Sequence, residues 1–125
     1  MQFAKRVYVG AGIWGVLILP PLYFLTASVS PQHPSVISDP LFYYAFLTVA
    51  LAWQFGFFVI GSDPVKYRPM MFPSLIEKFG HVLTVCIVYA EGRTGAGDVV
   101  AAVPDLVLGI LFVFALAKTA PGRAV

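Results

Sequence analysis

Four long apolar stretches constrain the fold of this chain more than any other feature of its sequence. A helix needs about 20 largely apolar residues to cross a hydrocarbon core about 30 Å thick. The pattern therefore predicts four membrane-spanning helices, with boundaries good to about 2–4 residues. They cover about residues 7–25, 41–60, 74–90 and 98–117. We expect an all-α, integral membrane four-helix bundle that forms one domain over residues 1–125.

The low charge of the chain supports the same conclusion. Only 11% of its residues are charged, and its mean hydropathy is +0.85. A soluble domain carries about 25% charged residues, so this chain has too few to cover a globular surface in water. No tract interleaves basic and aromatic residues, so nucleic-acid binding has no support. The expected partner is the lipid bilayer.

The basic residues predict the orientation of the helices. Seven of the eight Lys and Arg residues are expected on the same side of the membrane as the two termini, and Arg93 alone is expected on the other side. Those seven are Lys5, Arg6, Lys66, Arg68, Lys78, Lys118 and Arg123. By the positive-inside rule both termini are cytoplasmic, which predicts a multi-pass membrane protein.

The first apolar stretch could instead be a cleaved signal peptide, because "KR" precedes it and "TASVS" follows it. However, the run over residues 7–25 is longer than a signal core of about 7–15 residues. Cleavage would also leave three spans and break the alternation of charge. We therefore favour a retained helix.

A glycine motif lies inside the first stretch. "GAGIWG", from Gly10 to Gly15, matches the dinucleotide pattern G-x-G-x-x-G, which requires a preceding strand and a soluble helix. In a membrane span, Gly10, Gly12 and Gly15 instead predict close packing of helix backbones. Pro20 and Pro21 are expected to kink or end this helix, because each lacks a backbone donor.

The segment "FPSLIEKFGH" opens the third stretch with three ionisable side chains. "SLIE" fits a capping box, in which Ser74 caps the helix and Glu77 reaches back to its backbone N–H. Lys78 would then extend to the cytoplasmic headgroups. On this interpretation Glu77 and Lys78 form a cap and a rim.

His81 fits that interpretation less well. It lies one turn beyond Glu77, about 10 Å along the helix from Ser74 at 1.5 Å per residue. An ionisable residue at such a depth normally faces the interior of the bundle and is a functional-site hypothesis by default. The fourth stretch adds Asp105, directly after Pro104, and the second adds Gln54. The candidate ligand-binding or polar-core residues are Gln54, Glu77, His81 and Asp105.

Three interpretations of these polar residues remain open. They could form interhelical hydrogen bonds, each worth about 0.6 kcal/mol on average. They could line a ligand pocket or a proton-linked site. One histidine and two carboxylates could also ligate a metal, but nothing in their spacing selects one, so no metal site and no cofactor is assigned. Cys86 cannot form an internal disulfide because it is the only cysteine, and we expect a small buried core residue.

The connection "GSDPVKYRP" follows the second stretch. Asp63 and Pro64 predict a turn, because aspartate bonds its own backbone and proline fixes φ. Lys66, Tyr67 and Arg68, together with Lys78, would form a cytoplasmic interface with anionic lipid and the aromatic belt. Alternatively, Arg68 or Lys66 pairs with Glu77 or Asp63. His33, in the first connection, is expected to be a solvated loop residue.

Several of these segments carry a family resemblance. With "DPVKYRP", "EKF" and "PDLVLGILF", the chain resembles uncharacterised small four-helix bacterial inner-membrane proteins, which are similar in layout to the DoxX-like superfamily. The resemblance implies a four-helix membrane fold. It also implies a role close to quinone-coupled redox metabolism or as a partner of other membrane proteins. The chain lacks a cysteine pair for thiol redox chemistry, and no catalytic residue is carried over.

The expected function is therefore a non-catalytic one. The chain would bind a small lipophilic ligand (quinone or lipid) or act as an accessory subunit of a larger membrane complex. This predicts that Gln54, His81 and Asp105 converge on one cavity. An alternative is a proton-coupled small-solute transporter acting as a homo-oligomer, with Glu77, His81 and Asp105 as a relay. A third is an enzyme that uses His81 as acid or base, oriented by Asp105.

Overall fold

The computed structural model describes residues 2–25 and 39–122, and over these ranges it contains helices and no strand. Each of the four long helices is long and apolar enough to cross a membrane. The predicted all-α fold with four candidate spans is confirmed for this part of the chain. The helices are α1 (Gln2–Leu22), α4 (Pro40–Ser62), α5 (Met71–Ala90) and α6 (Ala96–Lys118), with a 3₁₀ turn η1 (Arg68–Met70) before α5.

The start of α5 differs from the prediction. The helix begins at Met71, three residues before Ser74, and no side chain caps its first turn. Proline is tolerated in a first turn, where backbone donors lack helical partners, so Pro73 does not stop the helix. Ser74 is buried, and its hydroxyl donates to the carbonyl of Met71 at 2.7 Å. The predicted capping box is therefore wrong.

The opposite end of α5 closes through a glycine in the left-handed region. Gly92 has a φ of 71°, and its N–H donates to the carbonyl of Tyr89 at 2.9 Å. The N–H of Arg93 donates to the carbonyl of Val88 at 3.0 Å. This pair of bonds is the Schellman arrangement, which satisfies the last carbonyls of a helix and turns the chain sharply. It allows α6 to begin within six residues and to run back along α5.

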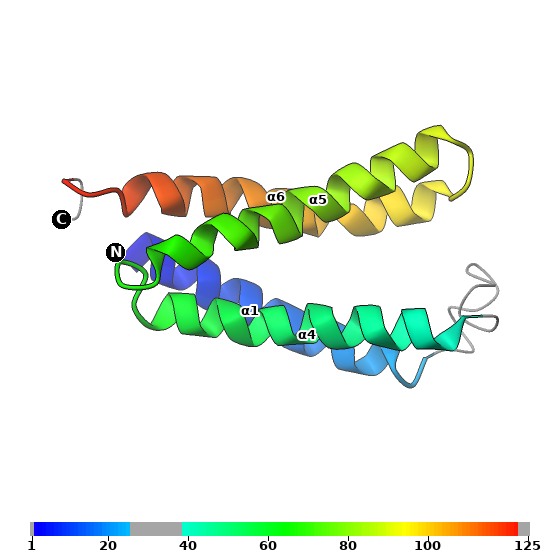
Figure 1. Cartoon of the computed structure of the whole chain (residues 1–125), viewed down its shortest axis with the longest axis horizontal. Coiled ribbons are helices and arrows are strands. Elements are labelled where there is room, and N and C mark those ends of the chain that lie inside the picture. The colour runs from blue at the N-terminus through cyan, green and yellow to red at the C-terminus, as the bar shows by residue number, and fades with distance from the viewer. Residues whose placement is uncertain (1, 26–38, 123–125) are drawn as a thin grey trace.

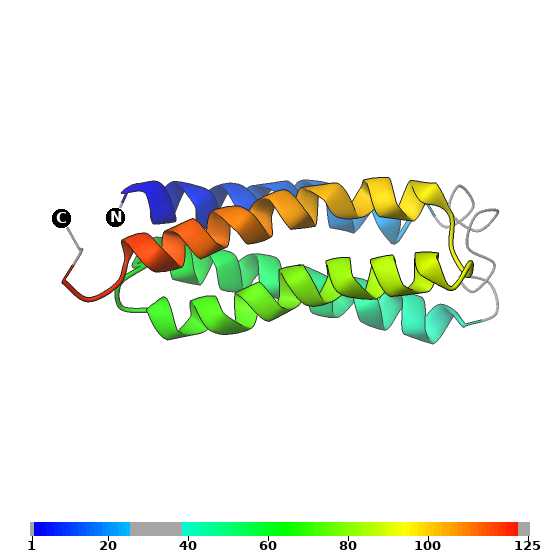
Figure 2. The ribbon, with the colours of Figure 1, turned by 90° about the horizontal axis from the view of Figure 1, so that it is seen from above.

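The bundle consists of two helix pairs. α1 packs along α4 and α5 packs along α6, and the two pairs form separate layers (Figure 1). Between the layers α1 contacts α6, whereas α4 and α5 make few contacts. The start of α1, the end of α6 and the α4–α5 connection lie at one end, called here the terminal end (Figures 1 and 2). The tight turn between α5 and α6 lies at the other end.

Glycines allow the close approach of α1 and α4. A Cβ atom added to Gly12 would lie 2.7 Å from the ring of Phe58, and one added to Gly15 would overlap the carboxamide of Gln54. Small residues let membrane helices approach closely and gain van der Waals contact. The packing prediction is confirmed for Gly12 and Gly15. It is wrong for Gly10, which has no neighbouring atom within 4 Å at that position.

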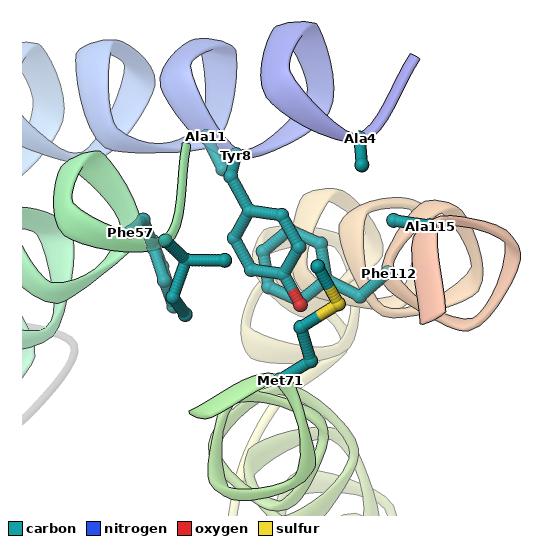
Figure 3. Packing of buried hydrophobic residues seen from close by; sticks show 8 residues of the cluster. Ala4, Tyr8, Ala11, Phe57, Met71, Phe112 and Ala115 are labelled. Carbon is teal, nitrogen blue, oxygen red and sulfur yellow. The ribbon is translucent and has the colours of Figure 1, made fainter. Parts of the chain in front are cut away.

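The main apolar core lies toward the terminal end and joins all four helices. The ring of Tyr8, on α1, stacks on Phe112 of α6 with centroids 4.2 Å apart, and Phe57 of α4 meets Phe112 edge-on (Figure 3). The hydroxyl of Tyr8 bonds Ser74 of α5 at 2.8 Å. Because Ser74 donates to Met71, it accepts from Tyr8. This core holds the two helix pairs together at one end.

The outer surface of the bundle is apolar, as a lipid-facing surface must be. Many large side chains point outward, among them Leu17, Ile76 and Leu83, each more than 60% exposed. Cys86 is also exposed, so the prediction of a buried core cysteine is wrong. Its neighbours Leu83 and Ile87 are exposed as well, which places Cys86 on the outer face of α5. An apolar residue in a membrane helix can face lipid instead of the protein interior.

Candidate ligand pocket

A cavity of about 860 Å³ lies between the two helix pairs, and all four long helices contribute to its wall. The wall is mostly apolar, and its polar part contains all four predicted polar-core residues. These are Gln54, Glu77, His81 and Asp105, and Lys78 joins them. The predicted convergence of Gln54, His81 and Asp105 on one cavity is therefore observed.

Lys78 connects two carboxylates across the α5–α6 interface. Its Nζ atom donates to Oδ1 of Asp105 at 2.8 Å and lies 3.3 Å from Oε2 of Glu77. The lysine side chain is only 5% exposed. Its ammonium group also lies 5.2 Å from the ring centroid of Phe57, a residue of the apolar core. The ion pairs are therefore adjacent to that core.

The position of Lys78 corrects the expectation that it belongs to the cytoplasmic interface. We expected its side chain to extend to the cytoplasmic headgroups, but it points into the bundle and pairs with Asp105. The physical reason is the buried carboxylate, because an isolated charge in a low-dielectric interior is far more costly than a paired one. The sequence spacing could have predicted an inward-facing lysine, because Lys78 and His81 are three residues apart and share a helix face.

His81 shares Asp105 with the lysine. Its Nδ1 atom lies 2.6 Å from Oδ2 of Asp105, while Oδ1 of the same carboxylate accepts from Lys78. The carboxylate is an acceptor, so Nδ1 carries the proton and donates. In the neutral imidazole, Nε2 is then the acceptor atom available to a ligand. Asp105 thus fixes both the ring orientation and the tautomer of His81.

Of the two carboxylates, that of Glu77 forms fewer hydrogen bonds than that of Asp105. Its Oε2 atom is buried and forms no hydrogen bond within the described part of the chain, although the ammonium of Lys78 lies 3.3 Å away. The positive charge of Lys78 compensates this carboxylate in part, and Glu77 remains one of the acidic residues of the cavity wall.

Gln54 lines the same cavity from α4. Its Nε2 atom donates to the carbonyl of Ala50 at 2.7 Å, and its carboxamide packs against Gly15 of α1. The hydrogen bond stays within α4, so Gln54 contributes a polar patch that is separate from the ion pairs of α5 and α6.

Four aromatic side chains on the wall were not predicted as part of a site. They are Trp14, Tyr43, Phe46 and Trp53. The sequence alone does not single them out, because aromatic residues are common both at membrane interfaces and in general packing. The ring of Phe46 lies 6.1 Å from that of His81, measured between centroids. Tyr43 donates its hydroxyl proton to the carbonyl of Leu22 at 2.8 Å, which ties α4 to the end of α1.

The predicted interface residues Lys66, Tyr67 and Arg68 lie in the α4–α5 connection at the terminal end, away from the pocket wall. The predicted turn is present, because the N–H of Tyr67 donates to the carbonyl of Asp63 at 3.0 Å. The guanidinium of Arg68 donates to the carbonyl of Leu116 at 3.2 Å, and Glu77 pairs with Lys78. The alternative in which Arg68 or Lys66 pairs with Glu77 is therefore wrong.

Two residues named from the sequence, His33 and Arg123, lie outside the described residues. Within residues 2–25 and 39–122, no three His, Cys, Asp or Glu side chains form a group that could hold a metal ion. Comparison with known proteins found no family model, no curated protein and no solved structure that matches the chain. Arguments about function therefore rest on the pocket itself.

Proposed function

We propose that this chain is a non-catalytic integral membrane protein that binds a small lipophilic ligand in the pocket between its helix pairs. The observation that carries the proposal is the convergence of Gln54, His81 and Asp105 on one mostly apolar cavity of about 860 Å³. Binding sites for drug-sized molecules have volumes of about 300–1,000 Å³, with apolar walls and a few convergent polar groups.

The wall suggests how such a ligand would lie. Its apolar body would pack against Trp14, Phe46 and Trp53, and its polar head would reach the side chains of Glu77 and His81. Membrane quinones and lipids have this division into an apolar body and a polar head. The sparse contacts between α4 and α5 favour entry from the bilayer, where such molecules are concentrated.

The composition of the wall supports a binding role over an enzymatic one. Asp105 orients His81 as in general acid–base sites. However, the described wall residues include no serine, threonine or cysteine beside that pair, so the Ser–His and Cys–His arrangements of acyl transfer are not formed by them.

The orientation and the cellular location also belong to the proposal. The start of α1, the α4–α5 connection and the end of α6 lie at the terminal end of the bundle (Figure 1). These segments contain five of the basic residues, namely Lys5, Arg6, Lys66, Arg68 and Lys118. By the positive-inside rule this end faces the cytoplasm of a bacterial inner membrane. A fluorescent protein fused to the C-terminus should therefore fold and fluoresce, whereas a fused alkaline phosphatase should be inactive. The reverse result would contradict this orientation.

Tryptophan fluorescence provides a direct test of ligand binding. The chain has two tryptophans, and both Trp14 and Trp53 line the pocket. A short-chain ubiquinone analogue should quench their emission in a saturable manner. Ala101, also on the wall, offers a blocking variant, since Ala101→Phe would fill the cavity without changing a charge.

Val100→Phe is the matched control, because Val100 is 68% exposed on the neighbouring position of α6 and does not line the pocket. The proposal expects Ala101→Phe to weaken quenching at least tenfold and Val100→Phe to leave it unchanged. Equal quenching of both variants would contradict the proposal.

A further inference from the structure

We propose that the pocket selects lipophilic cations, that is, molecules with an apolar or aromatic body and a single delocalised or quaternary positive charge. This inference rests on the proposed ligand-binding function and specifies its ligand class. The geometry that carries it is the combination of an excess of carboxylates and a set of aromatic rings on one cavity wall.

The cavity wall carries more acidic than basic side chains. Two carboxylates of the wall, those of Glu77 and Asp105, share one ammonium group, because Lys78 is the one Lys or Arg among the described lining residues. With a neutral His81, these three groups carry a formal charge of −1. Excess charge in a low-dielectric site is costly, so a cationic ligand is favoured and an anionic ligand is excluded.

The single ammonium group on the wall, that of Lys78, is already paired with carboxylates. Lys78 lies 2.8 Å from Asp105 and 3.3 Å from Glu77, and its side chain is 5% exposed. An anionic head group would have to break these contacts before it could pair with the lysine. Breaking a buried ion pair leaves uncompensated charges behind. Lys78 therefore balances the carboxylates and does not act as an anion receptor.

The atoms offered to a ligand are acceptors. Nε2 of a neutral His81 is an acceptor because Nδ1 donates to Asp105, and the carboxylate of Glu77 carries no donor. The oxygen atoms of a neutral quinone are acceptors too, so a quinone would bind through its apolar body and gain no hydrogen bond from these two groups. A positive charge is complementary to both, so a cation should bind more tightly.

The aromatic rings on the wall suit the same ligand. Trp14, Tyr43, Phe46 and Trp53 line the cavity from α1 and α4, opposite the ionised residues of α5 and α6. The face of an aromatic ring attracts a cation, and clusters of such rings recognise quaternary ammonium groups. A lipophilic cation in the cavity would thus meet both carboxylates and aromatic rings.

Two ions of equal size and shape test this selection. Tetraphenylphosphonium and tetraphenylborate differ in the sign of their charge and not in their apolar surface. Each is titrated into the detergent-solubilised full-length protein while the emission of Trp14 and Trp53 is followed. The inference expects half-saturation by the cation at a concentration at least tenfold below that of the anion.

Glu77→Gln should reduce this preference by about tenfold, because it removes one carboxylate from the wall. Glu91→Gln is the matched control, since Glu91 is an exposed residue paired with Arg93 beyond the end of α5. The control should retain the wild-type preference. If Glu77→Gln does not fold, the comparison of the two ions on the wild-type protein still decides whether the pocket selects cations.

The outcomes separate the two proposals. Equal affinities for the two ions, or tighter binding of the anion, would overturn the selection of cations, as would equal effects of Glu77→Gln and Glu91→Gln. If neither ion nor the ubiquinone analogue changes the emission of the folded wild-type protein, the ligand-binding function itself is refuted.

Discussion

Lys78 on α5 and Asp105 on α6 form a hydrogen-bonded ion pair, with 2.8 Å between Nζ and Oδ1, inside a bundle whose outer surface is apolar. Together with the hydrogen bond from His81 to Asp105, the pair joins α5 and α6 through polar contacts. It also lies at the boundary between the apolar core and the pocket, because Lys78 faces Phe57 on one side and the cavity on the other.

Removal of the lysine should destabilise the bundle strongly. Lys78→Met leaves the carboxylates of Glu77 and Asp105 without their shared counter-ion, and we expect a loss of about 3 kcal/mol in the free energy of unfolding. Lys66→Met is the control, because Lys66 is exposed at the terminal end, and it should change stability by less than about 0.5 kcal/mol. Unfolding in mixed micelles would measure both. Equal losses in the two variants would show that the ion pair does not stabilise the fold.

The hydrogen bond to Asp105 should set the tautomer of His81. We expect the neutral imidazole to carry its proton on Nδ1, because this atom donates to Oδ2 at 2.6 Å. The ¹⁵N chemical shifts of the ring nitrogens would identify the tautomer, in a His33→Gln background that leaves one histidine. Asp105→Asn should shift the population toward the Nε2–H form. A ring that is protonated on Nε2 in the unaltered pocket would contradict the assignment.

The contact between Gly15 and Gln54 should be sensitive to a single methyl group. Gly15→Ala places a Cβ atom within the carboxamide of Gln54, and overpacking of this kind costs about 1–3 kcal/mol. Gly10→Ala, in the same helix, meets no atom within 4 Å and should be neutral or slightly stabilising. Adding Gln54→Ala to Gly15→Ala should recover part of the loss. Thermal unfolding of the four variants would test the contact, and no recovery in the double variant would argue against it.

The single cysteine offers a test of how α5 meets the bilayer. Cys86 is exposed on the outer face of a helix that is apolar enough to span a membrane. A nitroxide label on Cys86 in liposomes should therefore be relaxed efficiently by oxygen, which concentrates in lipid, and weakly by a water-soluble nickel chelate. No cysteine-free background is needed. Efficient relaxation by the nickel chelate would mean that this face of α5 contacts water.

The four helices could be predicted from the sequence because apolar length alone determines them. The way in which α5 begins could not. Pro73 and Ser74 read as a helix N-terminus, but proline is compatible with a first turn, and the chain had already entered α5 at Met71. Ser74 then uses its hydroxyl for Tyr8, a residue 66 positions away in sequence. Local patterns carry no information about such a tertiary contact.

The polar part of the pocket was predictable for a similar reason. Gln54, Glu77, His81 and Asp105 stand out because polar groups are rare in apolar spans. Lys78 was assigned to the membrane surface, since a lysine near a helix end usually reaches the headgroups. Its true position depends on Asp105, 27 residues later, and so on how α5 packs against α6. The aromatic wall was missed because packing decides which of many aromatic residues face a cavity.

Native mass spectrometry of the protein, gently extracted from its own membrane, tests the ligand-binding function most directly. We predict a small lipophilic molecule bound to the wild-type chain and to Val100→Phe, and lost from Ala101→Phe, whose added ring fills the cavity. A wild-type protein that carries no small molecule and instead retains a partner protein would contradict a ligand pocket and favour an accessory subunit.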